Sequence, residues 1–284
     1  MKKMFAVTLL LALVLSCKKT ETAAPQPPPA ATERHATATT AAPRSQTAVT
    51  LPAGSSIPAA GVALWLAADD AKPAAGGKLA SWSNSGVANV SASAEKPGQQ
   101  PEVVANAING HSVVRFDGTD NMMMTNVDIS PAGMPEATVI AVFNSKTDQK
   151  TPLRKLYGDD NGSYDRAAGI DNRGGEEKNY TVFTGKGVEG YFTLKAGENY
   201  VTVDQYTKTD FSGWVDGKAM LTKVPAEWEE ALPNLYLGGT GTSYHETWMG
   251  DLAEIIVYAR VLTDQERVQV EDYLAKKYGV TITR

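Results

Sequence analysis

The sequence predicts an all-β fold, a β sandwich or jelly roll, that closes with one short helix. Short apolar runs alternate with Gly, Asn and Asp turns through most of the chain, which is typical of antiparallel sandwiches. Asp216 and Gly217 lie between two such runs and form a strong hairpin signal. Near the end, Thr263 and Glu266 fit the S/T-x-x-E capping box, which predicts a helix that begins at Thr263.

The first element in order is a signal peptide at residues 1–16. Lys2 and Lys3 give it a positive start, and the apolar stretch from Phe5 to Leu15 is too short to span a bilayer. A small residue and then Cys17 follow, and this ending resembles the lipobox of bacterial lipoproteins. The resemblance implies cleavage before Cys17 and diacylation of that residue. An ordinary secretory signal is the alternative.

Lipidation of Cys17 would have two consequences. Cys17 is the only cysteine, so no thiol would remain for a disulfide, a metal or a nucleophile. Two or three acyl chains would hold the protein stably at a membrane. Lys18, rather than Asp, follows the cysteine, and by the sorting habit of bacterial lipoproteins this implies the outer membrane of a Gram-negative cell.

Residues 17–56 form the second segment, the lipidated cysteine and a tether. The tether consists mainly of Ala, Thr and Pro, so it cannot bury enough apolar surface to fold, and we expect disorder. Removal of residues 1–16 would leave 25 basic and 32 acidic side chains, a formal net charge of −7. Such an acidic chain is a poor partner for nucleic acid or anionic lipid.

The folded domain is predicted to cover residues 57–284, and its strands follow from apolar runs bounded by turn residues. No stretch after the signal is apolar for long enough to be a transmembrane helix. The expected strands lie at 62–68, 113–116, 137–145, 180–185, 190–194, 199–207, 211–215, 218–221, 234–239 and 249–258.

The final helix is expected to be structural, packed back onto the sandwich. Gly279 is a natural residue to end it. The side expected to face the sandwich carries Val270, Tyr273, Leu274 and Lys277.

Five stretches carry a family resemblance: ALWLAADD, SWSNSG, QPEVVANAINGHSVVRFDGTDN, LYLGG and GDLAEIIVYARVLTDQERVQVEDYLAKKYG. In this order they resemble bacterial LamG-like domains, which are concanavalin A-like jelly rolls related to lectins and glucanases. The resemblance covers residues 57–282. It implies a sandwich of two antiparallel sheets with about seven strands each, and side chains that alternate into the layer between them. This fold carries many functions.

The sequence lacks the catalytic motifs expected of an enzyme with this fold. Glycoside hydrolases of the same fold place carboxylates on one strand as Glu-x-Asp-x-x-Glu, a spacing absent here. Asp251 and Glu254 are three apart in a strand, which predicts opposite faces. Glu227, Glu229 and Glu230 lie in an expected loop. There is also no histidine pair for zinc and no G-x-S-x-G motif, so we predict a non-enzymatic protein.

Oxygen-bearing side chains gather in the loop-rich stretch YGDDNGSYDRAAGIDNRGG, residues 157–175. Hard cations take such ligands, and LamG-like and lectin-like relatives often hold Ca²⁺ near a sandwich edge. The candidate ligands are Asp159, Asp160, Asn161 and Asp165. Asp and Asn are also ordinary turn residues, so turn formation without a metal is the alternative.

A glycan site on a β sandwich needs an aromatic surface with polar partners. Packing in the core is the alternative for each aromatic residue. The candidates in expected loops are Tyr164, Arg166, Tyr191, Tyr244, His245 and Trp248.

These features together predict a non-catalytic cell-envelope lipoprotein whose LamG-like domain binds carbohydrate or a cell-surface protein, for adhesion or envelope association. A disordered tether would let the domain sample partners away from the membrane. The alternatives are a polysaccharide hydrolase or lyase of the same fold and a purely structural envelope protein.

Overall fold

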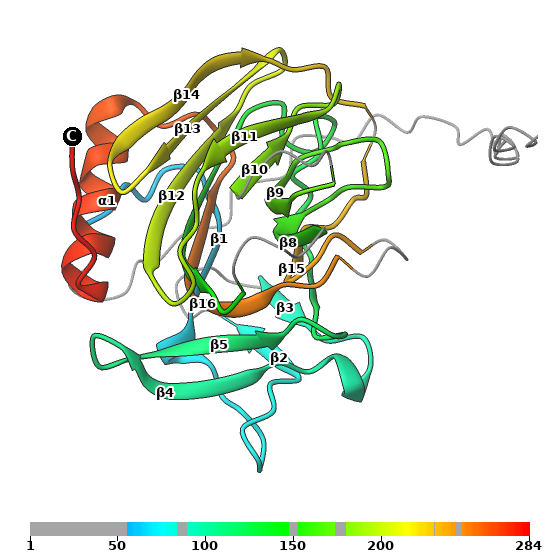
Figure 1. Ribbon diagram of the computed structural model, residues 1–284, viewed down its shortest axis with the longest axis vertical. Coiled ribbons are helices and arrows are strands. Elements are labelled where there is room, and N and C mark those ends of the chain that lie inside the picture. The colour runs from blue at the N-terminus through cyan, green and yellow to red at the C-terminus, as the bar shows by residue number, and fades with distance from the viewer. Residues whose placement is uncertain (1–55, 84–89, 148–152, 174–179, 230, 242–245) are drawn as a thin grey trace, which may run out of the picture. The chain divides into compact units, whose positions relative to one another are not determined.

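The computed structural model describes residues 56–83, 90–147, 153–173, 180–229, 231–241 and 246–284. Two antiparallel sheets face each other and one helix lies against one of them (Figure 1). The predicted all-β, two-sheet sandwich with a C-terminal helix is thereby confirmed. The signal, Cys17 and nearly all of the tether lie outside the described residues. Within those residues, no helix has the length and apolar character needed to cross a membrane.

Sheet 1 contains eight strands, of which seven follow one another and β1 (Val62–Ala67) pairs with β16. Every residue of the central β7 is buried, because the second sheet covers one face and the helix side covers the other. This explains why its sequence over residues 139–143 is a continuous apolar run rather than an alternating one. The order is β14 (Lys218–Pro225), β13 (Asp210–Val215), β12 (Asn199–Tyr206), β7 (Ala137–Ser145), β16 (Met249–Tyr258), β5 (His111–Asp117) and β4 (Glu102–Ile108).

Sheet 2 also contains eight strands, so each sheet has one more described strand than the family resemblance implied. Two short 3₁₀ helices, η1 (Ala68–Asp70) and η2 (Pro97–Gln99), lie in the connections. The order is β11 (Val188–Phe192), β10 (Tyr180–Phe183), β9 (Ala167–Asp171), β8 (Leu153–Gly158), β15 (Tyr236–Leu237), β6 (Met123–Thr125), β3 (Ser91–Ser93) and β2 (Ser81–Ser83).

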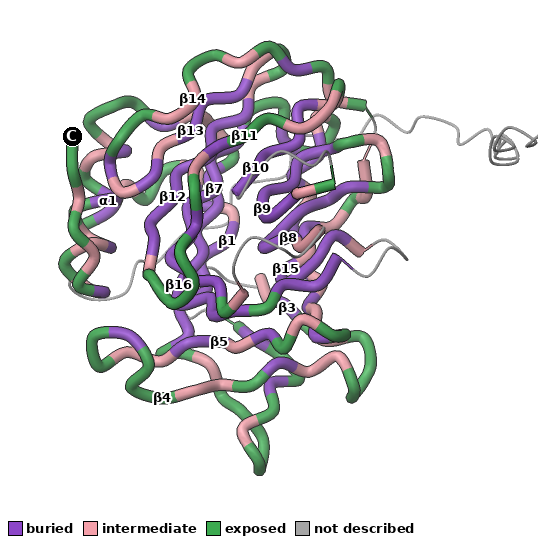
Figure 2. Tube along the Cα trace, viewed as in Figure 1, coloured by how far each residue is buried: buried purple, intermediate pink, exposed green. Residues whose placement is uncertain are grey.

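The two sheets enclose an apolar layer. Phe143 and Val257 from sheet 1 meet Leu156 and Val182 from sheet 2 in this layer. Each of these four side chains is at most 1% exposed to solvent. Figure 2 shows the buried colour along the inner strands of both sheets, whereas the edge strands β4, β11 and β14 are largely intermediate or exposed. Removing this apolar area from water is the main force that holds the two sheets together.

The helix α1 (Asp264–Tyr278) begins and ends where the sequence predicts. Thr263 is its N-cap and accepts a hydrogen bond from the backbone N–H of Glu266, whose carboxylate accepts one from the N–H of Thr263. Gly279 closes it with a left-handed φ of 68°, a conformation that glycine adopts without a steric penalty.

One face of α1 covers the outer face of sheet 1. Val270 and Leu274 are buried there with Trp65 and Ile256 in a second apolar cluster. The predicted packing face is therefore the one that packs, with Tyr273 at its margin.

A bulge in β16 overturns one prediction from the sequence. The pairing of β16 with β7 shifts between Leu252 and Glu254, which leaves Ala253 as an extra residue. Leu252 faces the inner layer, so Asp251 before it faces outward. Glu254 also faces outward, because it binds Trp65 of the outer cluster. The two carboxylates thus share one face, whereas regular alternation predicts opposite faces.

Candidate functional site

The predicted calcium ligands lie in the connection from β8 to β9. The Asp165 N–H donates to Asp160 Oδ1 at 3.0 Å, and the Asn161 N–H donates to Asp165 Oδ2 at 3.2 Å, so these carboxylates bind the backbone of their own turn. Burial raises the pKa of Asp165 to about 6 and raises that of Asp159 as well.

The contacts of these side chains are with the backbone of the turn. Ca²⁺ takes six to eight oxygen ligands. Among the described residues, however, no group of three or more histidine, cysteine, aspartate or glutamate side chains is placed to hold a metal ion. The contacts are those expected of turn formation.

The predicted glycan-binding residues are spread between surface and core. Tyr164 is 38% exposed, and its ring packs edge-on against Phe183. Tyr191 and Trp248 are core residues: the Tyr191 hydroxyl donates to the Trp214 carbonyl at 2.8 Å, and the Trp248 indole donates to a β7 carbonyl at 3.1 Å. Neither is accessible to a ligand. Tyr244 and His245 lie outside the described residues.

Arg166 is completely buried and binds backbone rather than a ligand. Its guanidinium donates to the carbonyls of Ile129 and Met134, both at 2.6 Å, and to that of Pro135 at 3.2 Å. It therefore pins the segment that leads into β7. Burial lowers its pKa although Asp159 lies near enough to act in the opposite direction.

Lys155 is a buried charge that the sequence does not reveal. It lies on β8 with no exposed surface, and its Nζ sits 3.5 Å from the centre of the Phe183 ring without a hydrogen-bond partner in the described structure. Burial lowers its pKa to about 8, against the attraction of Asp171 and Glu246. Because it is enclosed, it is not available to a ligand in this conformation.

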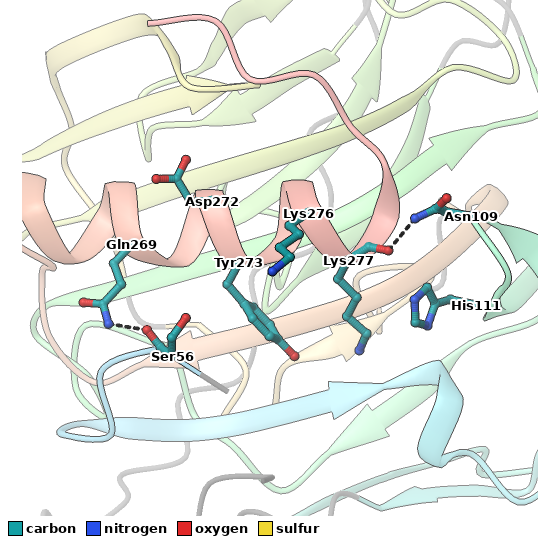
Figure 3. Close-up of a pocket in the computed structure, with 8 residues that line it drawn as sticks. All are labelled: Ser56, Asn109, His111, Gln269, Asp272, Tyr273, Lys276 and Lys277. Carbon is teal, nitrogen blue, oxygen red and sulfur yellow. Dashed lines mark hydrogen bonds between the residues drawn. The ribbon is translucent and has the colours of Figure 1, made fainter. Parts of the chain in front are cut away.

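An open groove of about 670 Å³ lies between α1 and the β4–β5 hairpin (Figure 3). We call it the α1 groove. Gln269, Tyr273 and Lys277 descend from one side of the helix at intervals of four residues, whereas Asp272 points the other way. The lining residues are Ser56, Asn109, His111, Gln269, Asp272, Tyr273, Lys276 and Lys277.

A buried carboxylate holds the wall of the α1 groove in place. Glu254 has no exposed surface and accepts three hydrogen bonds, from Trp65 Nε1 at 2.6 Å, the Tyr278 hydroxyl at 2.6 Å and Lys277 Nζ at 2.7 Å. Burial acts to lower the pKa of Lys277, but the Glu254 carboxylate outweighs it and the pKa is raised. The C-terminal turn of α1 is therefore fixed to β16 by charge as well as by apolar contact.

A second carboxylate orients the histidine of the groove. Asp69 Oδ2 lies 2.7 Å from His111 Nδ1, Asp69 Oδ1 accepts the Ser112 N–H at 2.8 Å, and Lys277 Nζ is 3.6 Å away. Burial acts to raise the pKa of Asp69, but these donors outweigh it and the pKa is lowered. Asn109 completes this end by donating to the Lys277 carbonyl at 2.8 Å.

The groove supplies groups suited to binding. Tyr273 offers a partly exposed ring that is held edge-on against Trp65, with ring centres 6.2 Å apart. Amide, imidazole and ammonium groups surround that ring. A rigid aromatic surface with a few placed polar groups is what a small-molecule or sugar site requires.

The sequence contains only indirect signs of this groove. Glu254 interrupts the apolar run LAEIIVY, and a buried charge in such a run indicates a partner. Tyr273 and Lys277 were expected to pack on the sandwich, and they do so while also lining the groove. His111 has no local pattern that connects it to the helix, since the helix lies far along the chain.

Comparisons with known proteins show the fold. No protein-family model matches the chain, and no curated protein matches it. Among solved structures it is similar to Trypanosoma rangeli sialidase, with a TM-score of 0.54 and 17% identity over 78% of this chain and 34% of that one. It is also similar to the same sialidase in complex with the inhibitor DANA, with a TM-score of 0.53 and 18% identity over 82% of this chain and 36% of that one.

A third structure is matched almost completely. It is domain 4 of AbnA, a GH43 extracellular arabinanase from Geobacillus stearothermophilus, in complex with arabinotriose. The TM-score is 0.51 and the identity 12%, over 75% of this chain and 98% of that one. The chain thus spans about a third of the length of the sialidases but nearly the whole arabinanase domain. At these identities the likeness establishes a shared β-sandwich fold.

Proposed function

We propose that the chain is a non-catalytic, lipid-anchored module of the cell envelope that belongs with the LamG-like domains and binds carbohydrate in the α1 groove. The observation that carries this proposal is Tyr273, a partly exposed ring that packs edge-on against Trp65 and is surrounded by the polar side chains of an open groove. Sugars bind such surfaces by laying their apolar C–H faces on the ring while hydroxyls reach neighbouring polar groups.

The structural likenesses support this proposal without deciding it. The arabinanase domain that this chain matches over nearly its whole length is described in complex with arabinotriose. A two-sheet sandwich of this size can therefore present a glycan site as an independent domain. The sialidase matches cover only a third of those chains, so they add no argument for a sialidase activity here.

The state of the two carboxylates on β16 favours binding over hydrolysis. They share one face, but Asp251 is held by both Arg115, at 2.6 and 3.0 Å, and Lys146, at 3.1 Å. Glu254 is enclosed by three donors. A glycosidase needs one carboxyl group to give a proton and another to attack or activate water, both facing the substrate. Neither of these two is free to do so.

The anchor is the second part of the proposal. The signal-like residues 1–16 and the following Cys17 support lipidation, and the Ala/Thr/Pro-rich residues 17–56 would then tether the domain to the outer membrane. Metabolic labelling with a palmitate analogue tests this: the label should enter the wild-type chain and be absent from the Cys17→Ser variant.

Glycan binding is tested by affinity electrophoresis of the full chain through gels that contain neutral or acidic polysaccharides. Tyr273→Ala should weaken the binding by about tenfold or more, equivalent to ~1.4 kcal/mol. Tyr164→Ala is the matched control, since it also truncates a partly exposed tyrosine but in the loop site predicted from the sequence. Weaker binding by Tyr164→Ala together with unchanged binding by Tyr273→Ala would place the glycan site in that loop. Retardation by no polysaccharide would refute the proposal.

A further inference from the structure

Two lysines line the α1 groove, whereas its lining carboxylate, Asp272, points away from the groove's tyrosine ring. The exposed Asp69 beside the groove is held by His111 and Lys277. We propose that the ligand of this groove is an acidic glycan, whose sugar carboxylate binds Lys276. This inference rests on the proposed function and adds the chemical class of the ligand to it.

Lys276 is the free cation of the groove. It is exposed on the last turn of α1, and it forms no hydrogen bond or ion pair with the described residues. Lysines at this end of a helix also offset the negative end of the helix dipole, which explains one favourable role for this residue. Its neighbour Lys277 lies in the same turn and is bound to Glu254, whereas the Lys276 ammonium group forms no such bond with the described residues. The N–H donors of Lys276 can therefore bind a ligand.

The carboxylates around the groove are already matched by cations or donors. Asp272, the acidic lining residue, lies on the opposite side of the helix from Tyr273 and binds Arg284 at 2.7 Å (Figure 3). Asp69 is bound by His111 and by Ser112, and Glu254 has no exposed surface. Among the described residues that line the groove, the charge left unpaired for a ligand is therefore that of the Lys276 ammonium group. This is a local property, because the whole chain is acidic with a net charge of −5.

The shape of the groove favours a sugar acid over a small inorganic anion. Gln269, Tyr273 and Lys277 line one side of the helix over about 12 Å, from eight residues at 1.5 Å each. A lone phosphate would use only one end of this length and would gain nothing from the Tyr273 ring. A chain of pyranose carboxylic acids uses both the ring face and the ammonium group. The NH2 groups of Gln269 and Asn109 bind the Ser56 and Lys277 carbonyls, and the oxygens of these two amides lie at the two ends to accept from its hydroxyls.

The test compares each acidic sugar with its own neutral form. The full chain is titrated calorimetrically with uronic acid oligosaccharides and with the same oligosaccharides after reduction of the carboxyl groups. The variants are Lys276→Met, which keeps the apolar stem, and Lys96→Met, which removes an exposed lysine in the η2 region as the matched control. A panel of neutral oligosaccharides, including arabinan fragments, is run alongside.

We expect the acidic form to bind at least tenfold more tightly than the reduced form. Lys276→Met should remove that difference and leave the affinity for the reduced form unchanged, while Lys96→Met should alter neither. Binding of acidic and neutral forms with equal affinity, or of neutral glycans alone, would overturn this inference and leave the proposed function standing. Absence of binding to any glycan would remove the proposed function itself.

Discussion

Asp204 lies inside the sandwich, and its replacement by asparagine probes the buried charges of the core directly. It sits on β12 with no exposed surface, and its Oδ2 accepts the Tyr157 hydroxyl at 2.6 Å. The Tyr157 and Tyr206 hydroxyls are 2.8 Å apart. Asp204 Oδ1 and the nearby Tyr180 hydroxyl have no hydrogen-bond partner in the described structure. The carboxyl group is thus enclosed by aromatic residues and only partly satisfied.

The magnitude follows from its pKa. Burial raises the pKa of Asp204 from 3.8 to about 7, although the hydrogen bond from Tyr157 acts to lower it. Between these two values the folded state keeps a proton that the unfolded state has released, so stability falls as pH rises through this range. A shift of about three units at 1.36 kcal/mol each makes this loss of order 4 kcal/mol at pH 8. Below about pH 4 the loss is absent.

Asp204→Asn keeps an acceptor for the Tyr157 hydroxyl and cannot ionise. The free energy of unfolding, measured with urea and tryptophan fluorescence, should favour the variant by ~1.6 kcal/mol at pH 5, because that pH already lies about 1.2 units above the unfolded pKa of 3.8. At pH 8 the variant should be the more stable protein, by up to ~4 kcal/mol. Asp120→Asn, at an exposed position, is the control for the removal of one carboxylate. If the difference between Asp204→Asn and wild type is the same at both pH values, the carboxylate ionises without cost and the reasoning is refuted.

Three further predictions concern stability. Burial lowers the pKa of Lys155 to about 8, so below that pH the folded state holds an unfavourable buried cation. Lys155→Met should therefore raise the free energy of unfolding at pH 7 by ~1–3 kcal/mol. Urea titrations should show this gain shrinking as the pH approaches 10. A less stable variant at pH 7 would show that the ammonium group has a partner. Gly169→Ala would place a Cβ 2.2 Å from the Arg154 carbonyl oxygen, so it should lower stability by about 3 kcal/mol, whereas Gly187→Ala, with open space, should have little effect. Equal unfolding midpoints for these two variants would contradict the steric argument. Thr263→Ala removes the N-cap of α1 and should lower the free energy of unfolding by ~0.5–2 kcal/mol, whereas Thr263→Ser should retain most of the stability. Chemical denaturation that ranks the two variants in the opposite order would argue against the cap.

The fold was accessible from the sequence because its signals are local. The runs at 137–145, 199–207 and 249–258 became β7, β12 and β16, and the capping box at Thr263 placed the start of α1. The Asp216-Gly217 turn joins β13 to β14 as expected, with Asp216 at a positive φ of 48°. Each of these features depends on a few neighbouring residues, so an isolated stretch of sequence contains the information.

The candidate site was not accessible in the same way, because it depends on partners far along the chain. The sequence predicts that Arg166 is a polar loop residue, yet its side chain is buried and donates hydrogen bonds to backbone carbonyls in residues 129–135. Trp248 reads as a loop aromatic, yet its indole binds Asn144, which is 104 residues away. The bulge at Ala253 arises from the pairing of β16 with β7 and leaves no mark in the local alternation. Burial and register are properties of the assembled sheets.

The single helix at the end of this β chain is explained by what lies beneath it. The outer face of sheet 1 is apolar around Trp65 and Ile256 and must be covered, which α1 does. At the margin of that cover, the Glu254 carboxylate binds both Lys277 and Tyr278, so the contacts that fix the helix also fix one wall of the α1 groove. Helix docking and ligand binding are then coupled: a ligand at one hundred times its dissociation constant would add about 2.7 kcal/mol to the stability of the docked state.

This coupling decides which substitutions are informative about binding. A change at Glu254 or Lys277 would loosen the helix and the groove together, so loss of binding would not identify a ligand contact. Tyr273 and Lys276 lie outside the hydrogen bonds to Glu254, although Tyr273 touches Trp65. Lys276→Met can therefore lower affinity while the unbound protein keeps its unfolding midpoint, whereas Tyr273→Ala also removes packing against Trp65 and its midpoint must be measured beside its affinity. Loss of affinity without loss of stability is the result that separates a binding groove from a helix that only covers the sheet.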